Sequence, residues 1–190
     1  MSNQRTISGT PDRSEWSPFH LGYLASRLPG LPGNEGILDG LDDDAASFLE
    51  RQVRELQELM CSVPSDRERH RYAPGKWSVR ELVGHLADTE RILSFRALAA
   101  ARGDQANIQP FDEEAYAASA GHDNLALGSL VEDLLDVRRS TLALARTFSA
   151  DQWRRQGVSN GSPVSARAWM FVIGVHADLH LETLRNRYLA

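Results

Sequence analysis

Apolar residues recur at intervals of three and four along four long stretches of the chain. Positions at this spacing share one face of an α-helix, so each stretch predicts an amphipathic helix whose apolar face lies against a core. No segment shows sustained alternation of apolar and polar residues, so we expect no β-sheet. The pattern therefore predicts an all-α fold, a four-helix bundle. The predicted helices span residues 42–60, 79–101, 127–148 and 165–188.

Local signals define the start of the second helix and the connection that follows it. Ser78 and Glu81 have the spacing of a capping box, in which each side chain accepts a hydrogen bond from the backbone N–H of the other residue. Gly103 is suited to the C-terminal cap, because glycine readily adopts the left-handed conformation found there. Residues 103–126 form a connection far longer than a tight antiparallel hairpin needs. We therefore expect a crossover here, with the helices on either side of it running parallel.

The first part of the chain departs from the helical pattern. Residues 1–19 are mostly polar and are expected to form a flexible lead, ahead of a bundle domain at residues 20–190. A short helix around residues 20–27 is expected to precede the turn-forming residues 28–36. The acidic residues 42–44 are interpreted as a helix start, where negative charge meets the positive end of the helix dipole, and not as a metal-binding loop.

Composition sets broad limits on function. The chain has 190 residues, 42% of them hydrophobic, which suffices for one domain with a sizeable core. Its formal net charge of −5 argues against a nucleic-acid partner, which usually requires a basic surface. The start of the chain lacks the apolar core of a secretory signal, and the apolar run at residues 168–177 is too short to span a bilayer. Cys61 is alone, so an internal disulfide is excluded. We expect a soluble, cytoplasmic protein with no membrane partner.

Three histidines stand where the helical stripes call for apolar core side chains. His85 lies on the second predicted helix, and His176 and His180 lie on the fourth. Residues four apart on a helix differ by a net rotation of about 40°, so His176 and His180 project from one face. Two imidazoles at this spacing can chelate one ion, with a third ligand from another element, for which His85 is the best candidate. Three protein ligands with an open position are typical of a catalytic metal site.

Each histidine also has a structural interpretation, as a hydrogen-bonded residue of the core or the surface. A buried imidazole needs partners for both of its nitrogens, and one shared ion would satisfy three imidazoles at once. The pattern alone leaves the structural and the metal-binding interpretations open. Imidazole is a ligand for zinc, nickel, iron and copper, so the ligand type does not select the metal. Ala177 follows His176, so the glutamate base of the His-Glu-x-x-His metalloproteases is missing.

Other polar residues adjoin the apolar stripes. An inward Arg96 or Arg138 would hold a substrate carboxylate with its guanidinium, whereas the simpler interpretation is that each extends outward to solvent. Glu90 is interpreted as a surface charge, in preference to a group that orients a ligand imidazole. Residues 111–116 of the crossover either form a lid or pack over the end of the bundle.

Three separated motifs resemble, in the same order, the sequences of one protein family. Residues 76–91 read KWSVRELVGHLADTER, residues 111–116 read FDEEAY, and residues 175–185 read VHADLHLETLR. They resemble the second-helix signature, the segment that follows it and the last helix of the DinB superfamily. The similarity covers residues 22–188, which is most of the chain.

The resemblance implies a bundle with an up-down-down-up topology and a divalent metal ion, zinc or nickel, held by His85, His176 and His180. Activities of related proteins are metal-dependent thiol transfers with low-molecular-weight thiols such as bacillithiol or mycothiol, and isomerisation that depends on glutathione or mycothiol. The resemblance therefore implies a metal-dependent enzyme acting on a small molecule, either a thiol S-transferase or a hydrolase. One alternative is a non-enzymatic bundle that binds a metal or a small ligand. Another is a structural bundle that forms a homodimer, which the extent of the apolar faces also favours.

Overall fold

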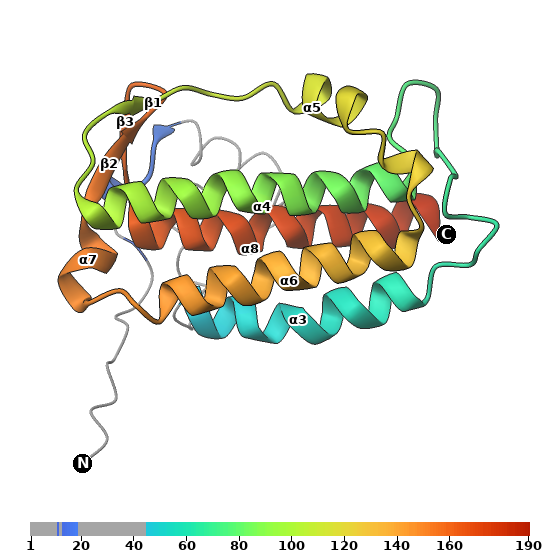
Figure 1. Ribbon diagram of the computed structural model, residues 1–190, viewed down its shortest axis with the longest axis horizontal. Helices are drawn as coiled ribbons and strands as arrows, with labels where there is room; N and C mark the ends of the chain where they lie inside the picture. Colours follow the sequence, from blue (N-terminus) through green and yellow to red (C-terminus); the bar gives the residue numbers. More distant parts are fainter. Residues whose placement is uncertain (1–10, 12, 19–44) are drawn as a thin grey trace, which may run out of the picture.

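The computed structural model describes residue 11, residues 13–18 and residues 45–190, and its body is a bundle of four long helices (Figure 1). These are α3 (Ala45–Cys61), α4 (Val79–Arg102), α6 (Leu127–Ala145) and α8 (Ala166–Thr183), and α8 continues as a π-helical turn, η3 (Leu184–Tyr188). All four predicted helices are confirmed. The first is confirmed only from residue 45 onward, because residues 42–44 lie outside the described residues.

The long connection between α4 and α6 makes these two helices run in the same direction. Ser78, at the start of α4, donates a hydrogen bond to Asp123, just before α6. At the other end, the guanidinium of Arg102 lies 5.6 Å from the ring centroid of Phe148, just after α6. Helices α3 and α8 run the opposite way, so the chain passes up, down, down and up through the bundle (Figure 1). The expected crossover is therefore present.

Capping groups define the ends of the helices where the sequence predicts them. The Ser78 hydroxyl accepts from the Glu81 backbone N–H at 3.1 Å, and a Glu81 carboxylate oxygen accepts from the Ser78 N–H at 2.8 Å. Gly103 ends α4 with a φ of 80°, in the left-handed region. The polar side chain of Ser149 caps a further short helix, α7 (Ala150–Arg154).

A small three-stranded sheet lies at one end of the bundle, so the expectation of no sheet was wrong. Strand β2 (Gln156–Ser159) pairs antiparallel with β3 (Ser162–Ser165), and β1 (Asn107–Ile108) pairs parallel with β2. Strands this short cannot show sustained alternation. The turn between β2 and β3 is formed by Asn160 and Gly161, whose φ angles are 49° and 73°. An Asn-Gly pair favours this kind of two-residue turn, and it was the signal available in the sequence.

The crossover contains a helix that periodicity did not predict. Helix α5 (Glu113–Ala120) is followed by a short 3-10 turn, η2 (His122–Asn124). Ala117 is the only residue of α5 that is buried, so this helix has no apolar stripe to reveal it. Asp112 caps its start by accepting from the Ala115 N–H at 3.0 Å.

Part of the expected N-terminal lead is buried against the bundle. Trp16 is buried, and its ring centroid lies 6.5 Å from that of Phe171 on α8. Glu15 is also buried and accepts a hydrogen bond of 2.6 Å from Arg167. The short helix expected at residues 20–27 lies outside the described residues. Among the helices that are described, none combines the length and the hydropathy of a membrane span.

A close approach between α3 and α8 requires glycine at position 174. A Cβ atom on Gly174 would lie 2.2 Å from the ring of Phe48, which is itself buried and 6.1 Å from the ring centroid of Phe171. The helix backbones can approach here only because Gly174 has no side chain.

We expect Gly174→Ala to lower the free energy of unfolding by roughly 1–3 kcal/mol, as overpacking of a core typically does. Urea denaturation of the purified variant measures this change. Gly128→Ala on α6 is the matched control, because a Cβ there meets nothing within 4 Å. Equal stability of the two variants would contradict the packing argument.

Candidate metal centre

The three predicted histidines meet between α4 and α8. The Nε2 atom of His176 lies 3.1 Å from Nε2 of His85 and 3.2 Å from Nε2 of His180. One ring nitrogen from each residue lies within 4.8 Å of the other two. His85 is buried, and the other two histidines are partly exposed. The structure therefore brings the three predicted side chains together, and their binding of a metal ion stays a prediction.

The spacing of the nitrogens suits a single divalent ion. Zinc–nitrogen bonds of about 2.0–2.1 Å at tetrahedral angles place two ligand nitrogens about 3.3 Å apart. Both Nε2 distances from His176 are close to this value. Nδ1 of His85 lies 3.4 Å from the Thr89 hydroxyl, which can hold the ring with its Nε2 lone pair directed at the site. The donor set is therefore compatible with zinc or nickel.

Burial favours the neutral form of two of the three histidines. Removal from solvent, reinforced by the neighbouring His180 and His122, lowers the pKa of His85 from 6.5 to about 3. Burial, together with His180 and His85, lowers the pKa of His176 well below its ordinary value. Both rings are therefore neutral at neutral pH, which is the form that binds a metal ion.

Trp77 covers the histidines and links them to the crossover. Its ring centroid lies 4.3 Å from that of His85 and 6.3 Å from that of His180, and the second pair of rings is stacked. The indole N–H donates to the Glu114 carboxylate on α5 at 3.1 Å. Trp77 is thus a packing residue, and it forms an apolar wall beside the imidazoles of His85 and His180.

Glu90 and Arg138 form a buried ion pair at the centre of the bundle. Arg138 has no exposed side-chain surface, and its Nε donates to the two Glu90 carboxylate oxygens at 2.8 and 3.1 Å. Its Nη1 donates to the Gln52 amide oxygen at 3.0 Å. The interpretations of Glu90 as a surface charge and of Arg138 as an outward-pointing residue were both wrong. Each charge is buried because the other helix supplies its partner, which a stripe on one helix does not reveal.

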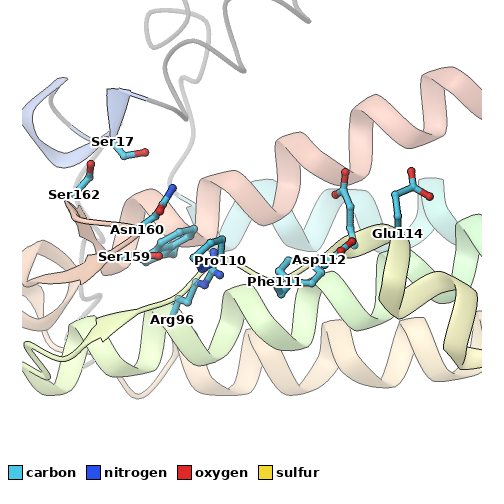
Figure 2. A pocket seen from close by; sticks show the side chains of 11 residues that line it. Ser17, Arg96, Pro110, Phe111, Asp112, Glu114, Ser159, Asn160 and Ser162 are labelled. Carbon is cyan, nitrogen blue, oxygen red and sulfur yellow. The ribbon is translucent and has the colours of Figure 1, made fainter.

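A cavity of about 500 Å³ lies beside α4 and α8, under the first part of the crossover. Arg96 lines it near Asn160 of the β2–β3 turn (Figure 2), and the rings of Trp169 and Phe111, which also line it, lie close to the Arg96 guanidinium. Glu113 and Glu114 line it as well, and Glu114 is the residue that bonds Trp77. Residues 110–114 therefore form a wall of a cavity that approaches the covering of the histidine site. Arg96 is buried, so the outward interpretation was wrong for this residue too.

We expect the metal-free protein to lose stability on acidification because of His85. In the unfolded protein, His85 takes up a proton near pH 6.5, whereas in the folded protein it does so only near pH 3. The unfolded state therefore binds more protons between these pH values, and the free energy of unfolding decreases as the pH is lowered. From pH 7 to pH 5, this contribution is about 2 kcal/mol. Urea denaturation in the presence of a chelator should therefore show a smaller loss for His85→Asn than for the wild type. An equal loss in both proteins would refute the assignment.

Comparison with known proteins agrees with this fold. The DinB superfamily profile matches residues 49–184. The structure resembles YfiT from Bacillus subtilis, described as a probable metal-dependent hydrolase with an unusual four-helix bundle topology, with a TM-score of 0.67 and 18% identity over 94% of each chain. It also resembles a mycothiol-dependent maleylpyruvate isomerase, with a TM-score of 0.59 and 15% identity over 73% of this chain and 58% of the isomerase. Among curated proteins, none matches the sequence. Because the family profile matches most of the chain, the chain belongs to the DinB superfamily.

Proposed function

We propose that this protein is a mononuclear, divalent-metal-dependent enzyme that acts on a small molecule. The observation that carries the proposal is the cluster of ring nitrogens from His85, His176 and His180. The two Nε2 distances from His176 are close to those between the ligand nitrogens of a tetrahedral zinc site. The likeness to YfiT, described as a probable metal-dependent hydrolase, supports it. Zinc or nickel is the ion that we propose.

Three protein ligands leave a coordination position for a water molecule or a substrate. When bound, the ion supplies a Lewis acid that lowers the pKa of a water or a thiol at that position. We favour a low-molecular-weight thiol as the group that is activated, which makes the reaction a thiol S-transfer. The mycothiol dependence of the structurally similar isomerase supports this choice. Hydrolysis, with water in place of the thiol, is the alternative.

The chain's own residues position and shield the site. His85 and His176 remain neutral because burial lowers their pKa values, so they are ready to bind a cation without first losing a proton. Trp77 excludes water from one side of the imidazoles by packing against His85 and His180. The cavity beside α4 and α8 provides room for a small-molecule substrate. A homodimer stays a prediction, which sedimentation of the purified protein tests.

Elemental analysis of protein purified without a histidine tag tests the metal site directly. We expect about one zinc or nickel ion per chain in the wild type, and a loss of that ion in His176→Ala, because two imidazoles bind more weakly than three. His70→Ala is the matched control, since His70 contacts Tyr188 and lies outside the histidine cluster. Retention of the full metal content by His176→Ala would exclude the three-histidine site.

Cobalt substitution tests whether a thiol takes the open position. Addition of mycothiol or bacillithiol to the cobalt-loaded protein should produce a thiolate-to-cobalt charge-transfer absorption, because a thiol that binds the ion loses its proton. The matched control is an analogue in which a hydroxyl replaces the thiol. A metal-loaded protein that shows no such absorption with either thiol would contradict thiol transfer and favour the hydrolase alternative.

A further inference from the structure

Arg96 is a buried cation that lines the cavity beside α4 and α8. Only 8% of the surface of Arg96 is exposed. Nη2 donates to the Gln109 carbonyl oxygen at 3.1 Å, whereas Nε is buried and has no hydrogen-bond partner among the described residues. A buried charge is unfavourable unless an opposite charge or enough hydrogen bonds compensate for the lost hydration. The positive charge of Arg96 is therefore not balanced by a carboxylate of the described part of the protein.

The other buried arginines of the described chain are each paired with a carboxylate, although Arg138 also has a buried nitrogen, Nη2, without a hydrogen-bond partner. Arg138 pairs with Glu90 at 2.8 Å, and Arg167 donates to Glu15 at 2.6 Å. No ion pair joins Arg96 to a carboxylate in the described residues, although acidic side chains line the same cavity. Among the buried arginines of the described residues, Arg96 is thus the one that lacks a paired carboxylate, and it is also the one that lines the cavity.

Aromatic rings hold the Arg96 guanidinium in place. Its central carbon lies 5.1 Å from the ring centroid of Trp169 and 6.0 Å from that of Phe111. Contacts of this kind orient a guanidinium without neutralising its charge. The two rings also give this end of the cavity apolar walls, while Asn160 and Ser162 of the β2–β3 turn add polar groups (Figure 2).

We propose that Arg96 is the anion-binding residue of this cavity and that the cavity takes a monocarboxylate with an apolar or aromatic body. A guanidinium that lines a cavity without a paired carboxylate is suited to a carboxylate ligand, and the rings of Trp169 and Phe111 are suited to a flat apolar group. Asp112, Glu113 and Glu114 line the same cavity, and Glu114 lies at the end away from Arg96 (Figure 2). Their negative charge opposes a polyanion such as a phosphate ester, so a ligand with a single negative charge is favoured.

The position of this site suggests what it does. Trp169 precedes His176 on α8 by seven residues, or two helical turns, so both side chains lie on the same face about 10 Å apart along the axis. A carboxylate bound at Arg96 would therefore anchor a substrate whose reactive group lies near the histidines. This anchoring role rests on the proposed function, whereas the binding of a carboxylate at Arg96 does not.

Isothermal titration calorimetry with hydrocinnamate tests the site. This probe has a phenyl ring and a carboxylate, and hydrocinnamamide is its uncharged counterpart. Metal-free wild-type protein should bind hydrocinnamate at millimolar concentration and bind the amide at least tenfold more weakly, the usual size of a charge-assisted hydrogen bond. Arg96→Gln should weaken hydrocinnamate binding by a similar factor. Arg102→Gln, an exposed arginine on the same helix, should leave binding unchanged.

Repeating the titration with zinc-loaded protein separates this proposal from the proposed function. Hydrocinnamate binding that survives Arg96→Gln and disappears with a chelator would place the carboxylate on the metal ion and overturn the Arg96 site. Equal affinity for the acid and the amide, or no binding of either by folded wild-type protein, would also overturn it. If Arg96→Gln fails to fold, the comparison of hydrocinnamate with hydrocinnamamide on the wild type still tests whether a carboxylate is preferred. Arg96→Lys then tests the guanidinium itself, because it keeps the charge and loses the planar group. Failure of the protein to bind zinc would leave the metal-free result unaffected.

Discussion

The guanidinium of Arg138 lies in the middle of the bundle without solvent contact, and it binds residues of α3 and α4 directly and is linked to α8 through Gln52. It pairs with Glu90 of α4 and donates to Gln52 of α3, and Gln52 in turn donates to the Gly174 carbonyl of α8 at 2.8 Å and to the Asp178 carboxylate. Removing one member of a buried ion pair typically costs about 3–5 kcal/mol, because the remaining charge is left uncompensated. A sliding of one helix against the others would break this network. This group of buried polar residues, the polar centre, therefore fixes the register of the four helices, which apolar packing alone specifies less strictly.

The same register places the histidines. Gly174 and Asp178 are four residues apart on α8, as are His176 and His180, and the two pairs are offset by two residues, or about 200° around the helix. One side of α8 therefore bonds Gln52 of α3, and the opposite side presents two imidazoles to His85 of α4. Because α8 lies between the polar centre and the histidine site, the contacts that stabilise the bundle also hold the candidate ligands within reach of one another.

Periodicity and local signals were enough to predict the long helices, the capping box of Ser78 and the inward position of each histidine, because each of these is encoded within a few turns of its own helix. The buried pair of Glu90 and Arg138 was not predictable in this way. Each residue has the sequence position of a surface charge, and only the structure shows that the opposing helix carries its partner. The β2–β3 hairpin was overlooked because its strands are only four residues long. The identity of the metal is not encoded in the pattern at all, because imidazole accepts several first-row ions.

The parallel course of α4 and α6 has a consequence for function. A tight hairpin would join antiparallel neighbours and leave the outer side of α4 and α8 uncovered, whereas a parallel pair requires a connection as long as the bundle. Here that connection passes over α4 and α8, and its residues Phe111 and Glu114 line the cavity. Glu114 also holds Trp77 against the histidines through its hydrogen bond. The topology thus supplies both the wall of a substrate-sized cavity and the cover of the candidate metal centre, so a movement of this one segment would change access to both.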